Sequence, residues 1–244
     1  KPISVERLSD GMDAMLPVMI RSKRGVDEDT AADVLIDARE VAALYPNDAG
    51  VQAALAEAEY DAGNTAAAIT AADAALAIDP SVKNAYVQKG YALFRMAREA
   101  DDEAAAYGEA MQPFSALNRL ENDHPLPLVY YYRSFAERGA EPTDTARHAL
   151  ERASQLAPFD RDLAMNVALM QAREGKIELA RSNLEPVAAN PHGGSAAGAA
   201  QRYLAALEQV EEGTQWRPGR EIDPTGLLQA LARQLADDSE DEDE

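Results

Sequence analysis

Residues Ala49–Pro80 read AGVQAALAEAEYDAGNTAAAITAADAALAIDP, and this stretch decides the fold. It holds two alanine-rich runs, which favour helices, separated by Gly63-Asn64 and stopped by Asp79-Pro80. Glycine often ends a helix and proline often follows one, so the stretch predicts a helix, a tight turn and a second helix. The residues at its anchoring, small and turn positions are Leu55, Ala56, Gly63, Ala68, Ala75, Leu76 and Pro80.

A proline at the end of each unit recurs along the chain at nearly constant spacing. Pro46 to Pro80 is 34 residues, and Pro125 to Pro158 and Pro158 to Pro191 are each 33 residues. A period of this size is typical of arrays of helix-turn-helix units, in which each pair of helices packs on the next. We therefore expect an all-α chain.

One interval departs from this spacing. Pro80 to Pro125 is 45 residues, which predicts an insertion near 97–113 that forms either a longer first helix or a loop. Proline is tolerated at the first position of a helix, so Pro113 is expected to begin the second helix of this unit, with Phe114 on its apolar face.

With this spacing, the chain resembles tetratricopeptide repeat (TPR) proteins over Gly25–Leu207. The resemblance rests on Ala49–Pro80, on the Tyr86–Gly90 opening of the next unit, and on Gly175, Ala180 and Pro191. It implies an all-α fold, an α-solenoid of about five TPR-like helix-turn-helix repeats with a C-terminal capping helix.

A narrower resemblance lies in two segments, NDHPLPLVYYYRSF from Asn122 and LERASQLAPFDRDLAMNVALMQAREGKIELARSNLEPVAANPHGG from Leu150. Both are similar to alphaproteobacterial TPR proteins whose repeats follow a zinc-peptidase-like domain made with a secretion signal. This resemblance favours the bacterial periplasm over the cytoplasm. We interpret the chain, which begins at Lys1 without a signal-peptide pattern, as a mature form or an excised domain.

The spacing and composition divide the chain into six parts. We expect an irregular first repeat at 1–48, the repeat array at 49–191, a capping helix at 192–211, a linker at 212–223, an amphipathic helix at 224–236 and a disordered acidic tail at 237–244. One side of the 224–236 helix carries Leu227, Leu228, Leu231 and Leu235. This side is predicted to dock on the repeat array, or to bind a neighbouring subunit or a separate protein.

Composition excludes several classes of partner. Asp and Glu number 43 against 23 Lys and Arg, a net charge of -20, which argues against nucleic acid and anionic lipid. No apolar run approaches the roughly 18 residues that a membrane helix needs, so no membrane insertion is expected. Hydrophobic residues are 46% of the chain but aromatics only 6%, so alanine supplies much of the apolar content, as suits closely packed helices.

Catalytic and metal-binding patterns are missing from the sequence. It has no cysteine, and its three histidines, His124, His148 and His192, are far apart in the chain. No HExxH, GxSxG or GxxxxGK[ST] pattern occurs. We therefore predict no catalytic residues, no metal site and no cofactor.

The TPR resemblance also implies a binding surface, because the first helix of each repeat lines the concave groove in that family. Carried onto this chain, the groove positions are Asn84, Val87, Tyr91, Arg95, Leu128, Tyr131, Phe135, Met165, Leu169 and Arg173, with Ala53, Glu57 and Tyr60 before them. Groove and core remain equally open for Tyr91 and Tyr131, whereas core is favoured for Phe94.

Two functions follow from these predictions. The first is a non-enzymatic protein-protein interaction scaffold that binds a peptide or helix in the concave TPR groove. The alternative is an accessory, substrate-positioning region of a larger, zinc-peptidase-like hydrolase whose catalytic domain is absent from this chain.

Overall fold

The computed structural model describes residues 9–23 and 28–219, and every regular element in these ranges is an α-helix. The predicted all-α fold is therefore confirmed. Two other predictions, the amphipathic helix at 224–236 and the acidic tail at 237–244, lie outside the described residues. Among the described helices, none combines the length and apolarity that a membrane span requires.

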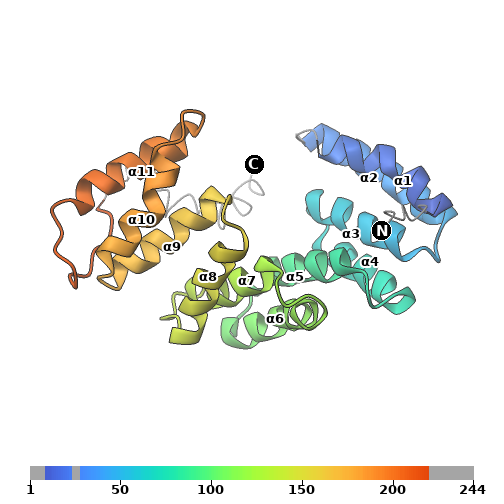
Figure 1. Ribbon diagram of the computed structural model, residues 1–244. Helices are drawn as coiled ribbons and strands as arrows, with labels where there is room; N and C mark the ends of the chain where they lie inside the picture. Colours follow the sequence, from blue (N-terminus) through green and yellow to red (C-terminus); the bar gives the residue numbers. More distant parts are fainter. Residues whose placement is uncertain (1–8, 24–27, 220–244) are drawn as a thin grey trace, which may run out of the picture. The chain divides into compact units, whose positions relative to one another are not determined.

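The chain divides into two compact units, Lys1–Asp123 and His124–Glu244. Helices of the first unit run from blue to green in Figure 1: α1 (Asp10–Ser22), α2 (Glu28–Leu44), α3 (Ala49–Asp61), α4 (Thr65–Ile78), α5 (Lys83–Ala97) and α6 (Glu103–Leu120). Those of the second run from yellow-green to orange: α7 (Pro125–Ala136), α8 (Asp144–Leu156), α9 (Arg161–Arg173), α10 (Ile177–Ala188) and α11 (Gly194–Leu207).

Local sequence sets where these helices begin and turn. Asp48 Oδ1 accepts from the Val51 backbone N–H at 3.1 Å, and Asp160 Oδ1 accepts from the Leu163 N–H at 2.9 Å. Such caps satisfy backbone donors that a helix N-terminus leaves without a partner. Gly63 turns the chain after α3 with φ +81°, a left-handed conformation that glycine adopts without steric cost.

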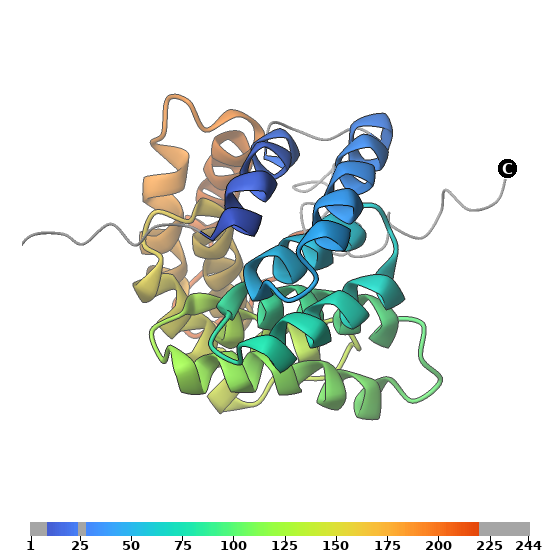
Figure 2. The ribbon, with the colours of Figure 1, turned by 90° about the vertical axis from the view of Figure 1, so that its right-hand side faces the viewer.

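Small residues bring the helices of the first unit close together. Its helices follow one another as the pairs α1/α2, α3/α4 and α5/α6, and α3 also contacts α5 (Figure 2). Ala53 and Ala56 of α3 are buried against alanines of α4 and α5. Gly90 of α5 makes room for Phe114 of α6, because a Cβ at Gly90 would lie 2.5 Å from the Phe114 ring.

Pro113 lies inside α6, so the expectation that it begins this helix is wrong. Asp102 caps the helix instead, with Oδ1 accepting from the Ala105 N–H at 3.1 Å. The extra residues are spread over the unit. Its second helix α6 has 18 residues against 14 in α4, its first helix α5 has 15 against 13 in α3, and the others lie in the turns after these two helices.

In the second unit, α9, α10 and α11 pack around a core whose residues are larger than the alanines between α3, α4 and α5. This core includes Leu169, Leu184 and Tyr203. The chain after α11 returns to this core. The Gly213 N–H donates to Gly175 O at 2.8 Å and the Trp216 N–H donates to Ala172 O at 2.8 Å. The first part of the segment expected to be a linker is thus hydrogen-bonded to the end of α9 and to the turn that follows it.

Candidate functional site

Polar and aromatic side chains gather on one face of the first unit, formed by the first helix of each pair. We call it the α1–α3–α5 face and define it by Lys23, Glu57, Tyr60, Asp61, Asn84, Tyr91 and Arg95. Lys23 directly follows α1, the next three residues lie on α3, and the last three lie on α5.

Side chains bridge the helices across this face. Asn84 Nδ2 donates to Glu57 Oε2 at 3.0 Å, and Glu57 also forms an ion pair with Lys23. Arg95 Nη1 donates to the Tyr60 carbonyl at 3.0 Å. Since each of these contacts joins two different helices, the side chains are held in place before any partner arrives.

The aromatic residues of the face form a stack with Arg95. Its guanidinium carbon lies 3.9 Å from the centre of the Tyr60 ring, and the Tyr60 and Tyr91 rings are 5.7 Å apart. Tyr91 also meets Phe114 of the core at 6.1 Å, so it contacts both the core and the half-exposed face. Phe94 is 2% exposed and is a core residue, as favoured from the sequence.

Electrostatics distinguish the two carboxylates of the face. Displacement of water by neighbouring protein atoms, and then the charge of Glu57, raise the pKa of Asp61, against the opposing effects of Lys23, Ser22 and Arg95. The hydrogen bond to Glu57 raises the pKa of Lys23. The Asp61 carboxylate is therefore less well compensated than that of Glu57, which is paired with Lys23 and Asn84.

Three predicted groove residues lie in the core instead. Val87 is 9% exposed, Met165 2% and Leu169 3%, so they offer no surface to a partner. Met165 and Leu169 are enclosed because α10 and α11 both pack against α9, and eight of its 13 residues are buried. The groove positions carried over from the TPR resemblance assume that the first helix of a repeat is exposed, whereas α9 is enclosed.

The other predicted residues of the second unit are partly exposed. On α7, Leu128 packs beside the core, and the Tyr131 and Phe135 rings meet edge-to-face at 5.6 Å. Arg138 lies over the Phe135 ring at 5.0 Å. Arg173, at the end of α9, is also partly exposed. The structure thus keeps these four predicted residues accessible on α7 and at the end of α9.

The second unit also contains a hollow of about 620 Å³ that sequence reasoning missed, bounded by α8, α9 and α10. We call it the α8–α10 hollow; its lining residues are Glu151, Ser154, Gln155, Pro158, Phe159, Asp160, Arg161, Ala164, Val167, Gln171, Leu179, Asn183, Pro186 and Val187. The one signal in the sequence for this hollow was Phe159, an aromatic residue in the turn between α8 and α9, where polar residues are usual.

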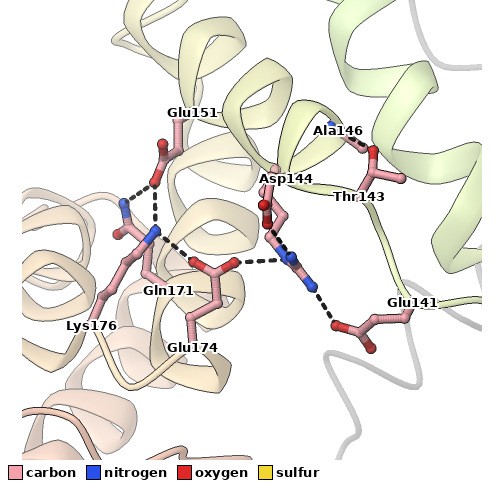
Figure 3. Close-up of polar contacts among 9 residues, drawn as sticks. Glu141, Thr143, Asp144, Ala146, Glu151, Gln171, Glu174 and Lys176 are labelled. Atoms are coloured by element: carbon pink, nitrogen blue, oxygen red, sulfur yellow. Dashed lines mark hydrogen bonds and ion pairs between the residues drawn. The ribbon is translucent and has the colours of Figure 1, made fainter.

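A polar network fixes one end of this hollow (Figure 3). Arg147 of α8 bonds Glu174 Oε1 at 2.8 Å, and Glu174 Oε2 pairs with Lys176 at 2.7 Å. Gln171 Nε2 donates to Glu151 Oε1 at 3.2 Å. These contacts join α8 to the end of α9 and its turn, so two walls of the hollow are tied together. No group of three metal-ligating side chains occurs in the described ranges.

Comparison with known proteins identifies the fold. No protein-family model matches the chain, and no curated protein matches it. A thermophilic TPR protein of Thermus thermophilus, TTC0263, superposes with a TM-score of 0.62 at 13% identity over 81% of this chain and 98% of that one. The fold is that of TPR proteins. MamA of Desulfovibrio magneticus superposes with a TM-score of 0.53 at 17% identity, over 74% of this chain and 94% of that one.

These likenesses confirm the predicted TPR-like architecture. The narrower resemblance to proteins with a zinc-peptidase-like domain stays a prediction, as do the accessory role in a hydrolase and the periplasmic location that it implied.

Proposed function

We propose that this chain is a non-enzymatic scaffold that binds a segment of another protein on the α1–α3–α5 face. The observation that carries the proposal is the stack of Tyr60, Tyr91 and Arg95 beside the Glu57–Asn84 pair. Preformed aromatic and arginine side chains are the kind of group that dominates binding energy at interfaces. The partly exposed Leu128, Tyr131, Phe135 and Arg173 are proposed as a separate binding surface of the second unit.

The chemistry of the face suggests what the segment looks like. An apolar side chain of an extended peptide or helix would cover the half-exposed rings of Tyr60 and Tyr91. A basic side chain next to it would offset the poorly compensated charge of Asp61. The net charge of -20 would also attract a basic segment at long range.

A capture experiment tests this proposal. The full chain is immobilised, and proteins retained from a bacterial lysate are compared with those retained by Tyr91→Ala. We expect at least one protein to be retained by the original chain and lost with the variant, because truncation removes a central ring of the stack. Circular dichroism during heating checks that both chains are folded.

Tyr86→Ala provides a matched control, because Tyr86 also lies on α5 but its hydroxyl donates to Pro80 O at 2.9 Å, away from the face. The partner should still be retained by this variant. Retention of the same proteins by Tyr91→Ala as by the original chain would show that the α1–α3–α5 face is not the binding surface.

A further inference from the structure

The α8–α10 hollow has an apolar rim that is exposed to solvent. Phe159 is 95% exposed and Leu179 51% exposed, and Val167 and Pro186 also belong to the lining. Each large apolar side chain left in water forfeits the free energy that its burial would contribute. A hollow edged in this way fits an apolar occupant.

Several polar groups in the lining already have partners. Gln171, which is 4% exposed, donates to Glu151 at 3.2 Å and accepts from Asn183 Nδ2 at 2.9 Å. Asp160 is bonded to the Leu163 N–H. Covering these groups with hydrocarbon therefore leaves few donors or acceptors newly buried without a partner, which is the usual cost of such packing.

The part of the chain that follows α11 returns close to the lining of the α8–α10 hollow. The Trp216 N–H is bonded to Ala172 O, one residue from Gln171 of the lining, and the Trp216 ring packs against Tyr203 at 6.1 Å. Pro224 follows Trp216 by eight positions, a stretch that spans at most about 28 Å when extended. The segment 224–236 can therefore reach the α8–α10 hollow.

The segment also matches the hollow in length and in character. As a helix, its 13 residues would be about 20 Å long, and α9, which forms the floor, also has 13 residues. Leu227, Leu228, Leu231 and Leu235 recur at helical spacing and supply an apolar side.

We propose that residues 224–236 dock as a helix in the α8–α10 hollow of their own chain, with the leucine side against the exposed Phe159, Leu179 and Pro186. A tether this short gives an effective concentration in the millimolar range, which favours the chain's own segment over that of a second copy. The docking involves the second unit alone, so it is independent of binding at the α1–α3–α5 face.

Cysteine labelling of the full chain tests the docking, because the sequence has no native cysteine. Gln155→Cys places a single thiol in the lining, and its reaction with a maleimide is timed. We expect the reaction to be about tenfold or more faster when Leu228→Asp and Leu231→Asp are added, because the docked helix covers the thiol. Leu44→Cys, at a residue 75% exposed on α2, should react equally fast with and without these changes.

The same labelling, repeated over a wide range of chain concentration with light scattering, separates the possible occupants. Protection that is independent of concentration in a monomer supports the proposal. Protection that rises with concentration, together with a dimer, means that a second copy fills the hollow and overturns it. Equal reaction rates with and without the aspartates mean that the segment does not cover the hollow, and also overturn it.

Discussion

The first helix of a helix pair has different surroundings in the two units. In the first unit, α3 and α5 keep polar and aromatic side chains half-exposed and bonded to one another, as between Asn84 and Glu57. In the second unit, α9 is enclosed by α10 and α11, and Met165 and Leu169 lie in the core. Equivalent repeat positions therefore lie at a half-exposed face in one place and in the core in another, and the neighbouring helices decide which.

Among the substitutions that test this comparison, we expect Leu169→Ala to cause the largest loss in the free energy of unfolding. Leu169 is 3% exposed, and truncating such a residue costs about 2–5 kcal/mol of the free energy of unfolding through lost burial and a residual cavity. Urea denaturation measures the loss, and Leu44→Ala, at an exposed position, is the control. A loss as small as in the control would show that Leu169 lies at the surface, as the groove positions of the TPR family imply.

A second prediction concerns the close approach of helices in the first unit. Gly90→Val should lower the free energy of unfolding by about 1–3 kcal/mol, because the new side chain meets the Phe114 ring. Gly108→Ala is the matched change in α6, where a Cβ meets nothing within 4 Å, and it should stabilise the chain by up to about 1 kcal/mol. Equal effects of the two substitutions would contradict the packing described for α5 and α6.

The polar network of the second unit predicts a smaller effect. Arg147→Ala removes the bonds to Glu174, Glu141 and Asp144, two of which are highly exposed. We expect a loss of about 1 kcal/mol, mostly from the partly buried Glu174, and a smaller loss at high salt. Arg152→Ala, whose exposed side chain bonds Gln155 at 3.2 Å, serves as the comparison in the same denaturation series.

The smallest effect, a pH dependence, separates two aspartates of the first unit. Because the pKa of Asp61 is raised in the folded chain, folding favours its protonated form, and its contribution falls as pH rises through the folded pKa. Asp61→Asn should therefore stabilise the chain at neutral pH, by a few tenths of a kcal/mol after solvent screening.

Asp79 should behave in the opposite way. The side-chain and backbone hydrogen bonds from Ser81 lower its pKa, so its contribution is present at neutral pH and is lost as pH falls. Asp79→Asn should then destabilise the chain at neutral pH and have little effect in acid. Denaturation of both variants across pH measures these signs, and a destabilising Asp61→Asn at neutral pH would contradict the electrostatics assigned to the α1–α3–α5 face.

The fold could be predicted from the sequence because its signals are local. Gly63 and Pro80 punctuate a repeat that is visible in one stretch, and the proline spacing carries it along the chain. The position of Pro113 could not be predicted in the same way, because an N-cap at Asp102 starts that helix earlier. A proline tolerated at the start of a helix can also lie within one.

The candidate surfaces could be predicted only in part. Asn84, Tyr91 and Arg95 lie on a half-exposed face, whereas the burial of Leu169 depended on how α11 packs. The α8–α10 hollow arises from the placement of three helices, and no short pattern in the sequence encodes such a placement.

The central claim is that binding energy resides on the α1–α3–α5 face, and one calorimetric series tests it most directly. A segment of the captured partner is titrated into the full chain, Tyr91→Ala, Tyr131→Ala and the control Tyr86→Ala. We predict that Tyr91→Ala weakens binding about tenfold or more, and that Tyr131→Ala weakens it less. Unchanged affinity in Tyr91→Ala, or a larger loss in Tyr131→Ala, would contradict the account.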